Sequence, residues 1–321
     1  IPSWATAGGS GSGGAILINA STIKGNGKLE ANGGNKGSYS TAGGAAGGRI
    51  ALRYRVSNQY VGVFEVGAGV SGTSGTPGPM NGTVAIVDAA NNDLYLLVGG
   101  GGAIAPDDGY HNGAPTTDGI FSFHNINIGN ATSTYALHVK GYYTNDNDDR
   151  GVILNASGNI TIYAGSSLNV NGTGFNGSIS SSAKGDGPGG GGSTASKGGT
   201  GGGYGGTGGL SDATNNPGRP YGSMFYPIRL GSGGGAYDSS IQTGSAGGGA
   251  VQLNALDTLE MNGTINASGI IPLYGTAGGS GSGGSILINA STVKGNGLLE
   301  AMGGKKNSYT SASGGGGRRI A

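Results

Sequence analysis

The sequence predicts an all-β protein, a parallel β-helix or solenoid whose repeats carry long glycine-rich loops. Three observations lead to this prediction. The stretch at 6–51 recurs without a gap at 276–321, and internal repetition is the signature of repeat architectures. Apolar residues arrive in short alternating runs bounded by Gly, Asn, Ser or Thr, which is typical of strands. Glycine supplies 77 of the 321 residues, and it interrupts every candidate helix.

The match extends upstream of this stretch, because Ile1-Pro2 and Ile271-Pro272 occupy equivalent places. A chain that begins and ends inside its own motif is expected to be a segment of a longer array. We therefore divide it into 1–270, one full period, and 271–321, the start of the next period and a copy of 1–51. The predicted sub-units are 6–102 and 151–270, both rich in strands and glycine, and 103–150, a less regular insert.

A strand–turn–strand–turn–strand unit of about twenty residues recurs inside the period. Its strands are predicted at 15–20, 22–24 and 28–31, at 152–156, 159–163 and 167–171, and at 250–255, 258–261 and 264–267. Less regular strands are predicted at 49–54, 62–66, 82–87, 93–98, 120–128 and 135–143.

In a solenoid, alternate residues of each strand point inward and stack as columns on the coils above and below. Ile16 with Ile18 and Ile160 with Ile162 are expected to do so. Asparagines at the strand ends have two readings: they form stacked ladders, or they only initiate turns. These residues are Asn19, Asn155, Asn254 and Asn289.

Glycine runs separate the strands, at 8–14, 43–48, 99–102, 187–209, 231–235 and 314–317. One reading is flexible linker. We favour ordered packing, because the runs alternate regularly with strands and glycine permits close backbone approach. The ordered runs would be loops along the solenoid or polyproline-II-like strands hydrogen-bonded side by side. An array of β-sandwiches with glycine-rich loops is the alternative architecture.

Charge and composition exclude several classes of function. A net charge of +1 provides no basic field for nucleic acid. The sequence has no apolar run of the roughly 18 residues that span a bilayer. It has no cysteine, so disulfides and thiolate sites are absent.

Several segments carry a resemblance. They are GGAILINASTIKGNGKLEANGG, GGRIALRY, GTVAIVD, ITIYAGSSLNVNGTGF, GGGYGGTGG, YGSMFYPIRLGSGGG and GGGAVQLNALDTLEMNGTINASG. Together they resemble the glycine-rich repeats of very large secreted surface proteins, which are interpreted as β-solenoid or adhesin-like arrays. The stretch LNASGNITIYAGSSLNVNG is also similar to coils of filamentous-haemagglutinin-type β-helices. The resemblance implies an extracellular or cell-surface, elongated and non-enzymatic protein.

Ten Asn-X-Ser/Thr sequons are candidate glycosylation sites, which in a secreted chain must lie on exposed turns. Asn81, Asn130 and Asn171 are preferred because they adjoin predicted turns. The others are Asn19, Asn155, Asn159, Asn176, Asn262, Asn266 and Asn289. In an Asn- and Ser-rich sequence, sequons also arise by chance.

Metal and catalytic patterns are weak. Asp146, Asp148 and Asp149 give oxygen ligands at the spacing of a calcium loop, but Arg150 and Ser157 stand where ligands are required. A solvated turn is therefore favoured over calcium. The histidines (His111, His124 and His138) keep no metal-ligand spacing. The glutamates (Glu30, Glu65, Glu260 and Glu300) are scattered along the sequence, whereas glycoside cleavage needs two carboxylates that converge.

Three functions follow from these patterns. The first is a structural repeat that self-assembles into an extracellular filament, appendage or cell-surface fibre. The second is the stalk of an adhesin whose binding module lies elsewhere. The third, a carbohydrate-active β-helix, has only fold analogy behind it. Tyrosine, with fifteen copies, is expected either at lateral contacts or at the edge of the core.

Overall fold

The computed structural model describes most of the chain, and all statements below concern those residues. The described ranges are 10–36, 43–70, 81–97, 102–104, 109–111, 114–116, 119–130, 136–139, 151–179, 183–193, 198–211, 216–237, 243–272, 277–306 and 313–321.

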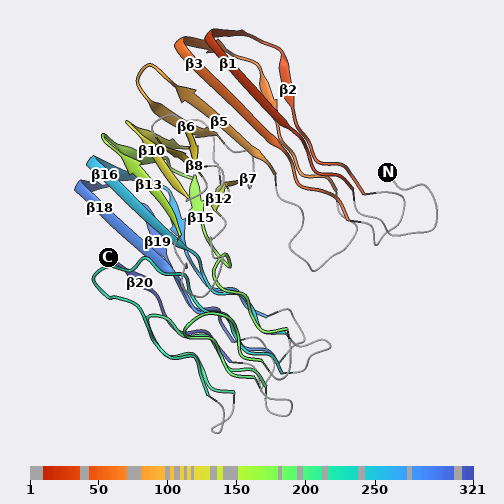
Figure 1. Cartoon of the computed structure of the whole chain (residues 1–321), viewed down its shortest axis with the longest axis vertical. Coiled ribbons are helices and arrows are strands. Elements are labelled where there is room, and N and C mark those ends of the chain that lie inside the picture. The colour runs from red at the N-terminus through yellow and green to blue at the C-terminus, as the bar shows by residue number, and fades with distance from the viewer. Residues whose placement is uncertain are drawn as a thin grey trace.

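The predicted all-β solenoid is confirmed: the described residues form parallel-stacked strands and contain no helix (Figure 1). The strands are β1 (Ala15–Gly25), β2 (Lys28–Glu30), β3 (Arg49–Tyr60), β4 (Val63–Glu65), β5 (Thr83–Asp88), β6 (Asp93–Leu97), β7 (Gly102–Ile104), β8 (Gly109–His111), β9 (Ala114–Thr116), β10 (Ile120–Phe123), β11 (Ile126–Ile128), β12 (Ala136–Val139), β13 (Val152–Ala156), β14 (Ile160–Ile162), β15 (Ser167–Asn169), β16 (Ala250–Met261), β17 (Thr264–Asn266), β18 (Ser285–Lys294), β19 (Leu298–Glu300) and β20 (Arg319–Ile320).

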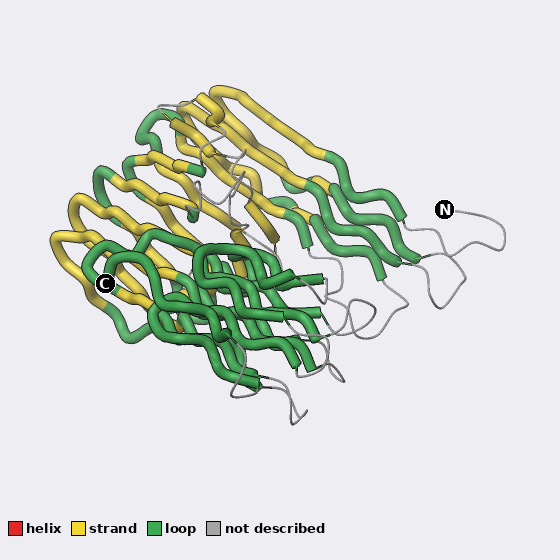
Figure 2. Tube along the Cα trace, turned by 60° about the horizontal axis from the view of Figure 1, so that its bottom comes forward, coloured by secondary structure: helices red, strands yellow, loops and turns green. Residues whose placement is uncertain are grey.

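One coil is longer than the strand unit visible in the sequence. Ala15 pairs with Arg49, and Arg49 pairs in turn with Thr83, at the same interval along the chain. Ser285 pairs with Arg319 over that interval as well. In the coils that begin at β1 and β18, the extra length lies in glycine-rich segments that leave the strands and return to them (Figure 2).

Each long strand serves both faces of the flattened coil. The first part of β16 pairs with β13 and its last part with β14. Leu256, which lies between the two parts, is 68% exposed. Figure 2 shows the long strands curving back on themselves at one side of the molecule. The single strand predicted at 120–128 is wrong for the same reason: the bend at 124–125 divides it into β10 and β11.

The large sheet contains two antiparallel pairs, β5 with β6 and β8 with β9, and the first of them joins its two halves. β5 and β6 pair antiparallel, whereas β3 with β5 and β6 with β11 are parallel. The connecting turn places Asn92 at φ 58°, a left-handed conformation that Asn tolerates better than most residues. β1 to β5 therefore form an N-terminal stack, and β6 to β20 a C-terminal stack.

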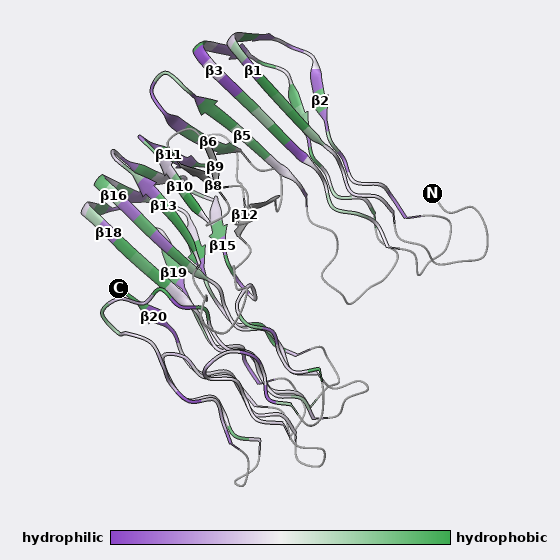
Figure 3. Ribbon diagram, in the orientation of Figure 1, coloured by the Kyte–Doolittle hydropathy of each residue, from purple (hydrophilic) through white to green (hydrophobic). Residues whose placement is uncertain are grey.

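Aliphatic columns fill both stacks, as expected, and Figure 3 shows hydrophobic residues concentrated in the strands. Ile126, Ile160 and Leu259 lie in register and are fully buried. Ile16 and Ile18 at the N-terminal end are half-buried and pack against the core of their own stack. Burial of each such side chain contributes about 1.5–3 kcal/mol.

The glycine runs are ordered, and they form the polyproline-II-like lattice that was one of the two ordered alternatives. Segment 279–284 shows its three-residue repeat, because every third N–H donates to the same neighbouring segment. The N–H groups of Gly279 and Ser282 donate to the carbonyls of Gly235 and Ser232. Those of Ser280 and Gly283 donate to Ser313 and Gly316, and those of Gly281 and Gly284 donate to Ile270 and Ala267. The backbone N–H and C=O groups of these segments, which form no strand ladder, are thus hydrogen-bonded to neighbouring glycine-rich segments.

Glycine is required in this lattice because neighbouring backbones touch where a side chain would begin. A Cβ placed on Gly281 would lie 1.9 Å from the Ala246 carbonyl oxygen. A Cβ on Gly201 would lie 1.9 Å from that of Gly314. These contacts explain why the glycine-rich segments are not interchangeable with ordinary polar loops.

The C-terminal stack carries an insertion that the N-terminal stack lacks. Val152 of β13 pairs with Val251 of β16, a much longer interval than the one between Ala15 and Arg49. Between β13 and β16, the chain makes extra glycine-rich passes, including 198–211 and 216–237. Figures 1 and 2 show these passes lying beside the last coils.

The two sequence copies have equivalent strands in different surroundings. β1 and β2 correspond to β18 and β19, and β3 and β20 begin at the equivalent Arg49 and Arg319. β1 is the end strand of the sheet, whereas β18 pairs with β16 on one side and β20 on the other. Among the described strands, the first copy therefore has a neighbour on one side and the second copy has neighbours on both sides.

Candidate functional site

An asparagine ladder runs along the bends between the two faces of the coils. Asp93 Oδ1 accepts a hydrogen bond of 3.0 Å from the Asn125 backbone N–H. Asn125 Oδ1 accepts one of 2.8 Å from Asn159 N–H, and Asn159 Oδ1 accepts one of 3.2 Å from Thr258 N–H. Each side chain thus satisfies the bend of the next coil and fixes the stacking register.

A second ladder follows the strands themselves. The Asn254 amide donates to Asn155 Oδ1 at 2.7 Å, and the Asn155 amide donates to Ser122 Oγ at 3.3 Å. Asn254 is also in register with Asn289. Of the two readings of these residues, the ladder therefore holds for Asn155 and Asn254. Asn19 differs, since it pairs in register with Arg53.

Glu30, Asn32 and Glu65 line a surface groove of about 860 Å³ in the N-terminal stack, and Lys28 joins them in a charged cluster. The Lys28 ammonium lies 2.6 Å from Glu30 Oε2 and 3.0 Å from Glu65 Oε2. Glu30 and Glu65 are register partners on β2 and β4, and the Asn32 amide donates to both. The structure therefore brings together two glutamates that are far apart in the sequence.

The electrostatics of this cluster suit an ion-paired layer contact better than general acid catalysis. Hydrogen bonds from Lys28 and Asn32 hold the pKa of Glu30 below its usual range. The hydrogen bonds from Lys28 to Glu30 and Glu65 raise the pKa of Lys28. A glycosidase proton donor needs a raised carboxyl pKa. The C-terminal stack has a related pair, in which Lys294 Nζ lies 2.9 Å from Glu260 Oε2.

A partly buried tyrosine–aspartate pair lies across β3 and β5 in the N-terminal stack. Tyr54 and Asp88 are register partners. Burial raises the pKa of Tyr54 to about 12, and the neighbouring Asp88 carboxylate adds to the rise. Burial acts to raise the pKa of Asp88 as well, but hydrogen bonds from Asn91 and from the Ala90 N–H outweigh it and lower that pKa.

We expect this pair to make the protein sensitive to alkali. The folded chain holds the Tyr54 proton more tightly than the unfolded chain, whose tyrosine pKa is about 10. The associated stability is present below about pH 10 and is lost as the pH rises towards 12. Urea unfolding at a series of alkaline pH values should show a smaller loss for Tyr54→Phe than for wild type. Equal losses of unfolding free energy in Tyr54→Phe and wild type would contradict this role of Tyr54. Tyr226→Phe, at an exposed position, is the control.

An aromatic cluster holds the insertion against the last coils. The buried Tyr204 hydroxyl lies 2.7 Å from Ser285 Oγ, at the start of β18. The rings of Tyr204 and Tyr221 meet edge-on, with centroids 4.9 Å apart. The Arg319 guanidinium lies 5.7 Å from the Tyr204 ring centroid. Tyr204 and Tyr221 therefore belong to the packed interior, whereas Tyr226 is 54% exposed.

The sequons occupy varied positions. Asn19, Asn159, Asn171, Asn176 and Asn289 are exposed, and Asn81, Asn130, Asn155, Asn262 and Asn266 are partly buried. In the strand ladder, the Asn155 amide nitrogen already donates to Ser122. Of the preferred sites, Asn81 accepts a hydrogen bond from the Ala68 N–H, and Asn171 lies in the exposed turn after β15. Asn19 and Asn289 are both exposed, in keeping with their equivalent positions.

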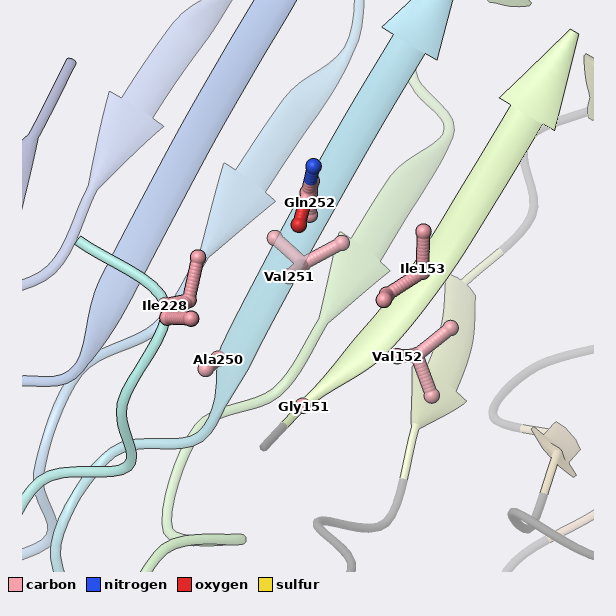
Figure 4. A pocket seen from close by; sticks show the side chains of 7 residues that line it. All are labelled: Gly151, Val152, Ile153, Ile228, Ala250, Val251 and Gln252. Carbon is pink, nitrogen blue, oxygen red and sulfur yellow. The ribbon is translucent and has the colours of Figure 1, made fainter. Parts of the chain in front are cut away.

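The remaining candidates give no binding site in the described ranges. Asp146, Asp148 and Asp149, the calcium candidates, lie outside those ranges. Within them, no group of three or more His, Asp or Glu is placed to hold a metal ion. His124 Nδ1 lies 3.1 Å from Ser157 Oγ. A recess between β13, β16 and Ile228 (Figure 4) has about 20 Å³ of space, enough for about one water molecule.

No protein-family model, curated protein or solved structure matches this chain. Among the residues that the structure describes, no helix is long and apolar enough to cross a membrane.

Proposed function

We propose that this chain is a structural repeat that forms part of an extracellular filament, appendage or cell-surface fibre by stacking coil on coil. The main support is the placement of the second copy. β18, which repeats β1 one period later in the sequence, stacks directly on β16 in parallel register. A following period is thus accommodated as one more layer of the same solenoid, and such growth is open-ended.

The surface chemistry also supports a structural role. Ladders of Asn side chains, shared ion pairs and the glycine lattice all join one coil to the next. These are contacts between like layers. The adhesin-stalk function uses the same stacking and differs only in a binding module beyond this segment.

Electron microscopy of native material tests the proposal. Along the sheet, seven strand spacings separate β1 from β18, through β3, β5, β6, β11, β14 and β16. At about 4.8 Å per spacing, one period should extend roughly 34 Å along the fibre. Filaments with this axial repeat are the expected result. Compact particles that never elongate would refute the fibre, and filaments capped by a distinct globular head would favour the stalk.

A further inference from the structure

One loop of the insertion presents apolar side chains to solvent in a fixed shape. Met224, Phe225 and Tyr226 are consecutive, and they are 63%, 80% and 54% exposed. The Ser223 hydroxyl accepts hydrogen bonds of 3.2 Å and 3.0 Å from the backbone N–H groups of Phe225 and Tyr226. We call residues 223–226 the tip. Large apolar side chains that gather at the surface mark interaction sites.

The tip is anchored on both sides. The Tyr221 hydroxyl donates to the Leu230 carbonyl, which closes the base of the loop. Behind the tip, the Tyr226 hydroxyl accepts a hydrogen bond of 3.4 Å from the Gln252 side chain on β16. A side-chain group that is already held in place loses little conformational entropy on binding. The tip is therefore preorganised for a partner.

The composition of the loop indicates what kind of partner it fits. Residues 219–229 read RPYGSMFYPIR. Met, Arg, Phe and Tyr are enriched at the centres of protein interfaces, whereas Lys, Asp, Glu and Ala are depleted there. The loop contains all four of the first group and none of the second. Arg219 and Arg229 stand at its two ends, so the matching surface is a protein surface that is apolar and acidic.

The groove in the N-terminal stack is a surface of this kind. Phe64, Val66 and Val84 supply its apolar lining, and the two glutamates of the charged cluster supply its acidic lining, whereas Lys28 is not among its lining residues. Among the described residues, the cluster's hydrogen bonds to Glu65 end on Oε2. Oε1 of that carboxylate is thus available to a guanidinium, which pairs well with carboxylates.

We propose that the tip of one chain docks in the groove of a second copy, with Phe225 against Phe64 and Arg219 at Glu65. The groove volume of about 860 Å³ lies within the roughly 300–1,000 Å³ of pockets that enclose ligands. Tip and groove are different surfaces, so each chain offers both and the contact links chain to chain. It is a lateral contact, beyond the axial stacking proposed above. One tip binds weakly, but many tips along a fibre act together.

Sedimentation of the full chain tests the docking. The weight-average mass of wild type should rise with concentration. Phe225→Ser removes the tip's main apolar side chain and Ala68→Arg fills the groove, so each should reduce this rise at least twofold. An equimolar mixture of the two variants should give two-chain complexes, because one variant keeps its groove and the other its tip. Leu256→Ser, at another exposed position, is the matched control and should behave as wild type. Equal assembly of wild type and Phe225→Ser would overturn the proposal.

Two further measurements keep the test decisive if Ala68→Arg misfolds. Glu65→Gln keeps the shape of the groove and should weaken association by about two- to fivefold, as expected for an exposed ion pair. The chain has no native cysteine, so mixing a Met224→Cys chain with an Ala68→Cys chain should give a disulfide between the two chains. A Leu256→Cys chain in place of Met224→Cys should give none.

Two results would refute the docking. One is the absence of the disulfide between the Met224→Cys and Ala68→Cys chains. The other is a wild type that does not self-associate but is retained on a sulfated polysaccharide, with retention lost in Arg219→Gln, since the loop would then be a site for an acidic glycan. Neither result changes the axial repeat expected for the fibre, so the lateral contact and the proposed function fail separately.

Discussion

Gly281→Ala should lower the free energy of unfolding by about 1–3 kcal/mol, the usual cost of forcing extra atoms into a packed interior. The new methyl group would lie 1.9 Å from the Ala246 carbonyl oxygen. A backbone oxygen cannot rotate away like a flexible side chain, so the glycine-rich segments that contain Ala246 and Gly281 must move apart. The same principle makes glycine obligatory at the crowded axis of collagen.

The chain supplies its own control for this substitution. Gly11 is the equivalent residue of the N-terminal copy, and a Cβ there would have nothing within 4 Å. Gly11→Ala should be neutral or stabilise by up to about 1 kcal/mol, because alanine restricts the unfolded chain. Urea unfolding of dilute protein gives both values. Equal effects of the two substitutions would show that the arms are not a packed lattice.

Tyr204→Ala should have the largest effect of any single side-chain truncation in the insertion, about 3–5 kcal/mol. The residue has no exposed surface, and its ring contacts Tyr221 and lies near the Arg319 guanidinium. Removing it leaves a cavity between the insertion and the β18 coil. Urea unfolding should show the loss, and limited proteolysis should show faster cleavage within 198–237.

Two further variants separate the parts of this effect. Tyr204→Phe keeps the ring and removes the hydrogen bond to Ser285, so it should cost about 1 kcal/mol. Tyr226→Ala, at a 54% exposed position of the same insertion, should change stability by less than about 0.5 kcal/mol. If Tyr204→Ala were as mild as Tyr226→Ala, the insertion would not be docked as described.

Local patterns in the sequence were sufficient to predict most of the strands and which of their side chains point inward. Ile160 and Ile162 alternate with polar residues, and both are fully buried. The bends were harder to recognise, because a bend such as 124–125 interrupts the pattern only briefly. The length of the coil was hidden as well, since glycine arms have no side-chain pattern to reveal where they pair.

The candidate sites divide in the same way. The sequons could be identified from each Asn and its two following residues. The absence of cysteine excluded disulfides and thiolate sites. The meeting of Glu30 with Glu65 was not recognisable, because a whole coil of sequence separates them and only the stacking register of β2 and β4 brings them together. The asparagine ladder at Asn125 and Asn159 was missed for the same reason, although recurrence of Asn after a short strand was a usable signal.

By itself, the sequence determined that this protein is all-β, glycine-dependent and repeated over a long period, since these properties follow from residue type, alternation and self-similarity. The tertiary structure alone decided which copy packs against the glycine-rich insertion. Burial depends on what packs on a strand: Ser285, on the same face of β18 as Leu287, contacts Tyr204 and Arg229 of the insertion, which the N-terminal stack lacks, so Leu17 and Leu287 share a sequence and differ in exposure.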